Sequence, residues 1–404
     1  MVILGLLLAV LLPVSAAALP AKEPVVQASA GRRVLGYYAP GDPTSWASLQ
    51  ENASAIDAIA GHWISIDACG NLASRDDQTL KQFAQANNIQ VFPSLLTLSG
   101  WLNHQLLSDE TVTANSIQQI VHYVTAEGYD GFDLDFEGVE AADRAAYTAY
   151  VAALGAALHE HGKALALALA AKTRDATTGW AGAYDYAALG HYADLITLMA
   201  YDYHGAWGGP GPVAPADWVD QVLAFATSQL PAEKVLLGIA FYGYDWNTTS
   251  GGTRSLSYSQ AARLADRYQV PIALDAATQS ATFRFEAPAS DPGPGTLPVP
   301  PLEHLVTTRA APPCPAVSPT AAPRPTAQPP PASSATQEHE VWLEESASAA
   351  ARLALADRYG VGGVATWRLG LEDPRVWPLF RQWRGNGSEE SVGYQAAGRV
   401  HLIR

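Results

Sequence analysis

From Arg33 onward, short apolar runs alternate with amphipathic stretches. Apolar runs of four to eight residues are typical of buried strands, whereas apolar residues spaced three and four apart are typical of helices. Asp143–His161 has the helical spacing, and Gly162 follows it as a helix stop signal. The pattern predicts eight strands, at Val34–Tyr38, His62–Asp67, Gln90–Ser94, Gly131–Glu137, Ala164–Ala170, Leu195–Tyr201, Val235–Phe241 and Gly363–Trp367.

This alternation predicts an α/β fold in which helices connect parallel strands. Eight such units are typical of a closed (β/α)8 barrel, or TIM barrel, whose functional residues lie at the carboxyl ends of the strands. An open doubly wound sheet would favour a glycine-rich phosphate loop after its first strand. Tyr38–Asp42 is not such a loop, so we expect the barrel.

The seventh and eighth predicted strands are about 120 residues apart, which is far more than one crossover requires. Ser257–Tyr268 reads as a helix, and Ala281–Glu286 and Glu338–Leu343 alternate like a pair of strands. We therefore expect a small folded insertion between these two barrel strands.

The same interval contains a proline-rich segment. Pro288–Pro331 holds 15 of the chain's 28 prolines, among Ala, Ser and Thr. Such a composition buries too little apolar surface to offset the entropy of ordering, so we predict a disordered or polyproline-like loop at 288–335. An arm that spans a cell wall or binds a partner is the functional alternative.

The charge balance excludes one class of partner. The 24 Lys and Arg residues against 39 Asp and Glu give a formal net charge of −15, which repels a nucleic-acid backbone. The two cysteines, Cys69 and Cys314, can form neither a disulfide scaffold nor a four-ligand zinc site. One disulfide is the most that they allow, and whether they pair stays open. We expect no cofactor and no metal ion.

The first 21 residues resemble a targeting segment. The apolar run Val2–Leu12 is followed by small residues at Ser15–Ala18, which suits cleavage by a signal peptidase. An uncleaved amino-terminal anchor is the alternative, although Pro13 interrupts the run before membrane-spanning length. We expect a monomer that is secreted or retained in the cell envelope, with one catalytic domain at 33–384 and a flexible tail at 385–404.

The most informative segment is Asp130–Glu137, which reads DGFDLDFE. Side chains of a strand alternate between its faces, so Asp133, Asp135 and Glu137 share one face about 6.6 Å apart. Like charges at that spacing cannot all ionise cheaply in a barrel interior, and Glu137, nearest the strand end, is placed to donate a proton.

The alternatives for this segment are a solvated acidic strand end and a Mg²⁺ or Ca²⁺ site. A core selected for stability would exclude three inward acids. No His or Asn ligand stands nearby in the sequence, which disfavours the metal site. The pattern therefore favours acid–base catalysis.

At this point the chain resembles the chitinase-like barrels of glycoside hydrolase family 18. DGFDLDFE is similar to the family's DGxDxDxE signature. Four further segments are similar to family strand ends in order and spacing, and the resemblance runs over about Arg33–Arg384. They are LGYY at Leu35–Tyr38, MAYDYHG at Met199–Gly205, LGIAFYG at Leu237–Gly243 and GGVATW at Gly362–Trp367.

Within the family, the chain looks nearest to spore-cortex and other peptidoglycan N-acetylglucosaminidases. Trp180–Tyr186, Tyr242–Trp246 and Trp367–Gly370 resemble segments of that branch. Chitinases usually carry SxGG on the third strand, where this chain has SLLT at Ser94–Thr97, and an Arg where it has Tyr244. Both departures count against binding of long chitin chains.

The resemblance implies substrate-assisted, retaining catalysis, in which the N-acetyl oxygen of the substrate attacks the anomeric carbon. By motif position, Glu137 would protonate the leaving oxygen and later activate water. Asp135 would stabilise the oxazolinium charge, and Asp133 would share a proton with it.

Further site residues follow from the same resemblance. Tyr201 would hold the acetamido carbonyl, and Asp202 would hold the distorted sugar. Trp367 would form the pocket floor. Met199, Tyr37 and Tyr242 are candidate wall residues that barrel packing alone would also explain. Three loop tryptophans are candidates for outer subsites, namely Trp101, Trp207 and Trp246.

The function expected from these residues is a secreted hydrolase of β-linked N-acetylglucosamine glycans, with peptidoglycan fragments or chitin oligosaccharides as substrate. One alternative is a non-catalytic carbohydrate-binding protein of the same fold, although such proteins usually lose the position of Glu137. Another is an endo-acting enzyme on N-linked glycans, which shares every motif. The choice of polymer and of exo or endo action is not determined by the sequence.

Overall fold

The computed structural model describes residues 32–291, 293 and 336–385. Eight parallel strands close a barrel in the order β1-β15-β9-β8-β7-β6-β5-β2, which confirms the predicted fold. The barrel strands are β1 (Arg33–Tyr38), β2 (Ala58–Gly61), β5 (Gln90–Thr97), β6 (Gly131–Phe136), β7 (Ala164–Ala170), β8 (Leu195–Met199), β9 (Val235–Ala240) and β15 (Gly363–Trp367).

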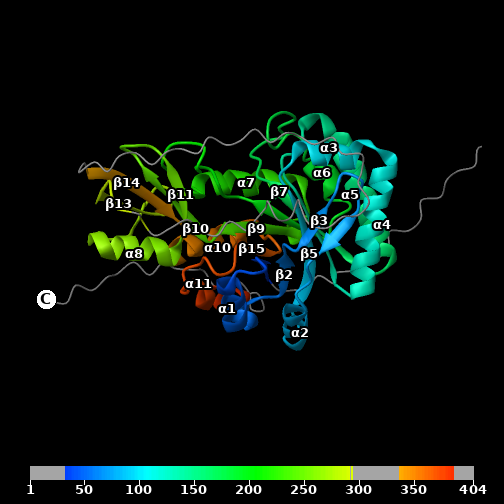
Figure 1. The fold of residues 1–404 in the computed structure, drawn as a ribbon, viewed down its shortest axis with the longest axis horizontal. Coiled ribbons are helices and arrows are strands. Elements are labelled where there is room, and N and C mark those ends of the chain that lie inside the picture. Colours follow the sequence, from blue (N-terminus) through cyan, green and yellow to red (C-terminus); the bar gives the residue numbers. More distant parts are fainter. Residues whose placement is uncertain (1–31, 292, 294–335, 386–404) are drawn as a thin grey trace, which may run out of the picture.

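Helices between these strands surround the barrel, and the insertion extends from one side of it (Figure 1). The predicted helix at Asp143–His161 is α5 (Arg144–Glu160), which starts one residue later and ends one residue earlier. The other helices are α1 (Pro43–Asn52), α2 (Gln78–Ala86), α3 (Gly100–Ser108), α4 (Glu110–Glu127), α6 (Tyr186–Leu189), α7 (Ala216–Gln229), α8 (Tyr258–Tyr268), α10 (Ser346–Tyr359) and α11 (Val376–Gly385).

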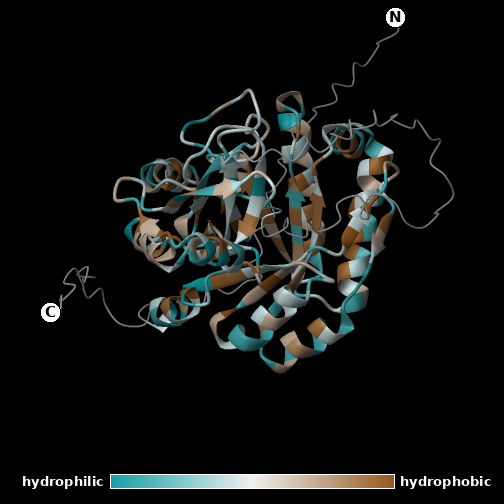
Figure 2. Cartoon of the chain, turned by 60° about the vertical axis from the view of Figure 1, so that its left-hand side comes forward, coloured by the Kyte–Doolittle hydropathy of each residue, from teal (hydrophilic) through white to brown (hydrophobic). Residues whose placement is uncertain are grey.

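Strand alternation divides the barrel into two cores. Leu35 and Tyr37 of β1, with Ala164 and Ala166 of β7, belong to a small cluster inside the barrel. The residues between them point outward into a larger cluster shared with the helices. Figure 2 shows hydrophobic colour along the central strands and hydrophilic colour on the outer parts of many helices. The barrel interior is therefore a packed layer, with its open site at the strand ends.

The prediction of the second strand was wrong. His62–Asp67 was expected in the barrel, but the barrel strand is β2, four residues earlier, where every residue is buried. The four residues of β2 are small or apolar and no polar residue separates them, so the alternation that marks a strand is missing. Ile64–Ile66 instead forms β3, which pairs antiparallel with β4 (Leu72–Ser74) in a separate hairpin.

The insertion is a five-stranded sheet with α8 against it. The predicted pair is confirmed, because β13 (Ala281–Pro288) and β14 (Thr336–Leu343) are antiparallel neighbours. The sequence did not predict the three remaining strands, namely β10 (Tyr242–Asn247), β11 (Thr253–Ser257) and β12 (Ala273–Leu274). Only Phe241 separates β10 from β9, so β10 connects the insertion sheet to the barrel rim.

Several predictions fall outside the described residues. They are the targeting segment at 1–21, most of the proline-rich segment at 288–335, nearly all of the tail at 385–404, and Cys314. Cys69 is disulfide-bonded. Among the described residues, no helix has both the length and the hydropathy needed to cross a bilayer.

Candidate active site

Strand β6 divides its residues as the alternation predicts. The side chains of Phe132, Leu134 and Phe136 are fully buried in the outer core beneath the helices. Asp133 and Asp135 point into the barrel, where they are 0% and 3% exposed. Burial of two neighbouring carboxyl groups is costly in a core, so their presence marks this end of the barrel as functional.

Asp133 lies deepest. The hydroxyl of Ser94, its register partner on β5, donates to Asp133 Oδ2 at 2.6 Å. Burial raises the pKa of Asp133 to about 6, and the bond from Ser94 offsets part of that shift. The segment Ser94–Thr97 departs from the SxGG pattern, but it retains the serine, and this serine contacts Asp133.

Asp135 is one pleat nearer the strand end. Burial, followed by the charges of Glu137 and Asp133, raises the pKa of Asp135 well above its usual range. Neither Asp133 Oδ1 nor Asp135 Oδ1 has a hydrogen-bond partner among the described residues. Because two adjacent buried carboxyl groups repel when both are ionised, the pair favours holding a proton.

Glu137 follows the last residue of β6 and reaches the open end of the barrel. Its backbone is fixed by a bond from its own N–H to Thr97 O at 2.8 Å and by Asn103 Nδ2, which donates to Glu137 O at 2.6 Å. Gly138 then turns the chain with a φ of +67°. Burial, with the charge of Asp202, raises the pKa of Glu137 to about 7. A carboxylic acid that stays protonated near neutral pH suits a general acid.

Asp202 faces Glu137 from the loop after β8. It adopts a left-handed backbone conformation, with a φ of +58°, and its Oδ1 accepts from Tyr242 at 2.5 Å and from Tyr244 at 3.0 Å. Burial raises the pKa of Asp202, and the two hydroxyl groups oppose that rise. Tyr201 packs its ring edge-on against Tyr242, with 6.3 Å between the centroids.

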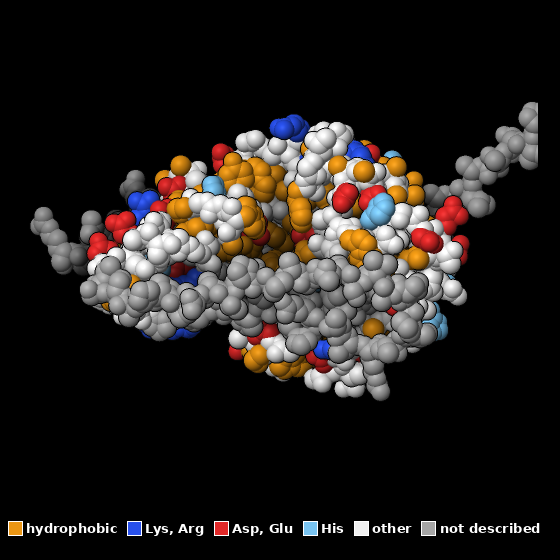
Figure 3. Space-filling model, turned by 45° about the horizontal axis from the view of Figure 1, so that its top comes forward, with side chains coloured by type: hydrophobic (Ala, Val, Ile, Leu, Met, Phe, Trp, Pro, Cys, Tyr) orange, Lys and Arg blue, Asp and Glu red, His pale blue; other side chains and the backbone are white. Residues whose placement is uncertain are grey.

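These side chains border a cleft of about 690 Å³ at the carboxyl ends of the strands. Figure 3 shows a hollow on this face that is rimmed by hydrophobic side chains and has acidic side chains within it. Four of the predicted site residues line the cleft, namely Glu137, Tyr201, Asp202 and Met199. The other lining residues are Leu98, Ala170, Ala171, Trp180, Trp207 and Trp218.

The remaining candidates form an aromatic group in the barrel mouth. Trp367 is half-buried at the end of β15 and packs against Tyr37, with 5.4 Å between the ring centroids. His62 packs against both rings and is fully enclosed, which lowers the pKa of its imidazole to about 3. The sequence drew no attention to His62, since a lone histidine after a strand carries no signal of its own.

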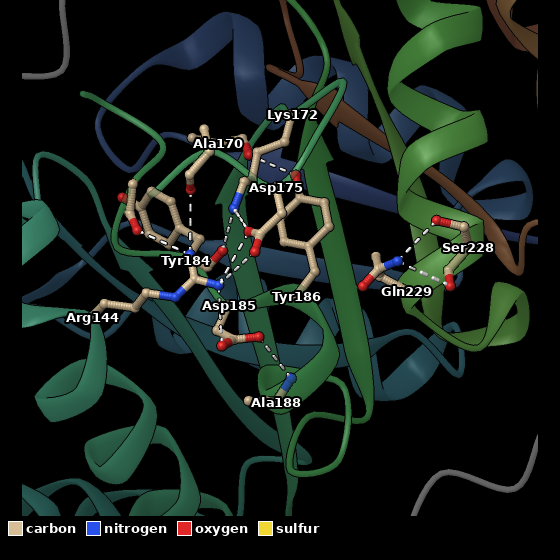
Figure 4. Close-up of polar contacts among 12 residues, drawn as sticks. Arg144, Ala170, Lys172, Asp175, Tyr184, Asp185, Tyr186, Ala188, Ser228 and Gln229 are labelled. Atoms are coloured by element: carbon tan, nitrogen blue, oxygen red, sulfur yellow. Dashed lines mark hydrogen bonds and ion pairs between the residues drawn. The ribbon is translucent and has the colours of Figure 1, made fainter. Parts of the chain in front are cut away.

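The loop at 171–185 carries Trp180 and is held by ion pairs and hydrogen bonds of Lys172 and Arg144 (Figure 4). Lys172 is 3% exposed, and its Nζ donates to Asp175 Oδ1 at 2.9 Å and to Tyr184 O at 2.8 Å. Arg144 of α5 also pairs with Asp175, at 3.1 Å. The bond from Lys172 to Tyr184 joins the two ends of the loop, and the pair of Arg144 with Asp175 ties the loop to α5, so these contacts restrain the segment that carries Trp180.

Sequence reasoning missed five lining residues, namely Leu98, Ala170, Ala171, Trp180 and Trp218. Leu98 directly follows β5, a position that could have marked it as a candidate. Of the three loop tryptophans expected in outer subsites, only Trp207 lines the cleft described here. Trp246 is 3% exposed and donates its indole N–H to Gly208 O at 3.1 Å, so it packs within the structure.

Comparison with known proteins agrees with this geometry. Residues 33–372 match the glycosyl hydrolases family 18. This match covers most of the chain. It includes the barrel strands and the acids of β6, which are the features from which the family resemblance was expected. The chain belongs to glycoside hydrolase family 18, and it is a glycosidase.

Relatives within the family include spore proteins and chitinases. The chain is 26% identical over 365 residues to the uncharacterized glycosylase YvbX of Bacillus subtilis, covering 88% of this chain and 92% of that protein. It is 28% identical over 321 residues to the cortical fragment-lytic enzyme of the same organism, covering 77% of this chain and 64% of that enzyme.

Among solved structures, a chitinase from Chromobacterium violaceum superposes with a TM-score of 0.70 at 25% identity, covering 89% of this chain and all of that one. The spore cortex-lytic enzyme SleL of Bacillus megaterium also gives a TM-score of 0.70, at 24% identity, covering 88% and 74%. At 24% identity, the likeness to SleL is evidence for the fold alone.

Proposed function

We propose that this protein hydrolyses β-linked N-acetylglucosamine glycans by substrate-assisted, retaining catalysis, with peptidoglycan fragments or chitin oligosaccharides as substrate. The observation that carries the proposal is the run of three acids on one face of β6, with Glu137 at the cleft and Asp133 and Asp135 buried beneath it. The relatives named cortical fragment-lytic enzyme and chitinase support both substrate classes.

Glu137 donates its proton to the glycosidic oxygen while the substrate's own acetamido oxygen attacks the anomeric carbon. The bond to the leaving sugar breaks, and a cyclic oxazolinium forms. Asp135 accepts the acetamido N–H and balances the developing charge, and Asp133 shares the remaining proton beneath it. Glu137, now ionised, takes a proton from water, which opens the ring with retention of configuration.

Tyr201 and Asp202 position the substrate in this scheme. Tyr201 donates to the acetamido carbonyl and holds it near the anomeric carbon. Asp202 holds the distorted sugar, and its charge adds to the effect of burial, which raises the pKa of Glu137 to about 7. Trp367 offers an apolar surface for the C–H face of the pyranose, beside Tyr37. Tyr242 acts through Asp202, to which it donates, and Met199 lies in the cleft wall.

The test is release of chromophore from mono-, di- and tri-N-acetylglucosamine glycosides, with Glu137→Gln as the paired variant. The wild type should release product, and the variant should lose a factor of about 10² to 10⁴ in kcat with its circular dichroism unchanged. The preferred glycoside length separates exo from endo action. Full activity in the variant contradicts the role of Glu137, and oligosaccharide binding without any release favours the carbohydrate-binding alternative.

We also propose that the protein acts outside the cytoplasmic membrane, because the sequence of residues 1–21 resembles an export signal. Fractionation of producing cells, with and without these residues, tests this. Equal recovery of both forms in the cytoplasm contradicts export.

A further inference from the structure

The charge of the cleft bears on which sugar can leave. Two of its described lining residues, Glu137 and Asp202, are acids, and none of them is Lys, Arg or His. The rest of the lining is mainly apolar, with three indole rings. The whole chain carries a formal charge of −15, so its net long-range field also disfavours an anionic ligand.

Two cations that are next to site residues in the sequence, Lys172 and Arg368, are already engaged. Lys172 is buried and donates to Asp175 and Tyr184 (Figure 4). Arg368, next to Trp367, pairs with Asp42 Oδ2 at 2.6 Å, and both side chains of that pair are buried. Arg174 is exposed on the loop at 171–185 but is not among the described residues that line the cleft.

The leaving sugar has to pass next to Glu137. A Cβ placed on Gly138 would lie 3.5 Å from Cζ3 of Trp180, so this indole stands directly beside the residue that follows the proton donor. Trp180 is 58% exposed and Trp207 is 71% exposed, so both offer open faces at the cleft. Exposed indole faces suit the C–H face of a neutral pyranose.

The two candidate polymers differ at this position. In chitin the leaving sugar is N-acetylglucosamine, which carries no charge. In peptidoglycan cut after N-acetylglucosamine, the leaving sugar is N-acetylmuramic acid, whose lactyl group is on C3. That carbon is next to the C4 oxygen that receives the proton. An ionised lactyl carboxylate would therefore lie beside Glu137 in a cleft where the negative charge of Asp202 opposes it and no described lining cation can pair with it.

We propose that the cleft selects an uncharged leaving sugar, either N-acetylglucosamine or a muramic acid residue whose carboxyl group is blocked as an amide. This inference rests on the proposed function and narrows its substrate class. It makes the charge of the leaving sugar, rather than the polymer type, the property that the enzyme discriminates.

The test compares three oligosaccharides of equal length. The first is an N-acetylglucosamine–N-acetylmuramic acid repeat with free carboxyl groups, the second is the same repeat as its methylamide, and the third is the chitin oligosaccharide. At pH 7 and low ionic strength, kcat/KM should be at least about fivefold higher for the methylamide than for the free acid. This ratio should shrink at 0.5 M salt, because salt screens the repulsion.

Two lysine variants assign the effect to the cleft. Leu98→Lys adds a cation at an exposed lining position and should lower the ratio of kcat/KM for the methylamide to kcat/KM for the free acid. Leu274→Lys adds a cation at an exposed position on β12 and should leave this ratio unchanged. The inference is overturned if kcat/KM is equal for the free acid and the methylamide. It is also overturned if Leu98→Lys leaves the ratio of these two kcat/KM values unchanged. Failure to cleave any of the three contradicts the proposed function itself, so the two failures are distinguishable.

Discussion

The hydroxyl of Tyr244 donates to Asp202 Oδ1 at 3.0 Å, on the oxygen that Tyr242 also contacts. Both tyrosines belong to β10, the strand that joins the barrel to the insertion sheet. The insertion therefore fixes the acid that faces Glu137. This contact also gives a structural role to Tyr244, the position at which the sequence was expected to depart from the Arg of chitinases.

Tyr244→Phe should shift the pH dependence of catalysis. Loss of one donor raises the pKa of Asp202, so Asp202 carries less negative charge at a given pH. The pKa of Glu137 then falls, and the alkaline limb of the kcat/KM profile moves to lower pH. The profile of kcat/KM from pH 4 to 9 measures this. Tyr258→Phe, which removes an α8 hydroxyl that accepts from Arg375, is the control and should leave the profile in place.

The wild-type enzyme should lose activity as the pH rises through about 7. Burial and the charge of Asp202 raise the pKa of Glu137 to about 7, and only the protonated form can donate to the leaving oxygen. The pH profile of kcat/KM on a chromogenic glycoside tests this. A rate that stays level from pH 6 to 9 contradicts the assignment of Glu137 as the acid.

Folding stability should fall as the pH rises from 4 to 8, in part because of Asp133. Its folded pKa is raised to about 6 from an ordinary value near 4, so the folded state binds the extra proton. The contribution of this proton to the free energy of unfolding is complete at acid pH. It is lost as the pH rises through the folded pKa, and the total loss is about 3 kcal/mol. Urea unfolding of wild type and Asp133→Asn measures this. The variant should show a smaller decline, and an equal decline in both would exclude Asp133 as a source.

Lys172→Met should weaken substrate binding more than the chemical step. Without the bonds from Nζ to Asp175 and Tyr184, the loop at 171–185 loses the contacts that place Trp180 at the cleft. We expect KM to rise several-fold with kcat reduced less. Lys81→Met, which breaks an ion pair with Glu127 on a distant face of the barrel, is the matched control. A fall in kcat alone would contradict a role in positioning the loop.

Arg352→Met should destabilise the fold by about 3 to 5 kcal/mol, because it leaves a buried partner uncompensated. Arg352 Nη2 lies 3.2 Å from Glu344 Oε2 and donates to Ser280 at 3.1 Å, and both ends of the pair are 2% exposed. Thermal unfolding measures the loss. The double variant Arg352→Met, Glu344→Gln should recover part of it, and no recovery would argue that the loss comes from packing.

The sequence alone determined the barrel and its central acids. Local patterns carry that information, since alternating apolar and polar positions fix which face of β6 is buried. The regular succession of strands and helices fixes the parallel topology. DGFDLDFE therefore placed Asp133 and Asp135 inside and Glu137 at the strand end before any contact was known. Seven of the eight barrel strands were predicted for the same reason.

Only the tertiary structure decided which side chains meet from distant segments. Tyr244 reaches Asp202 across 42 residues, and His62 packs against Trp367 across 305, although neither pair has a periodic signal. Strand β2 was misplaced because its four small or apolar residues carry no alternation, and only their pairing with β1 and β5 in the closed barrel marks them as a strand. Local alternation reports the face of a strand, but partners, burial and the resulting pKa values depend on the closed barrel as a whole.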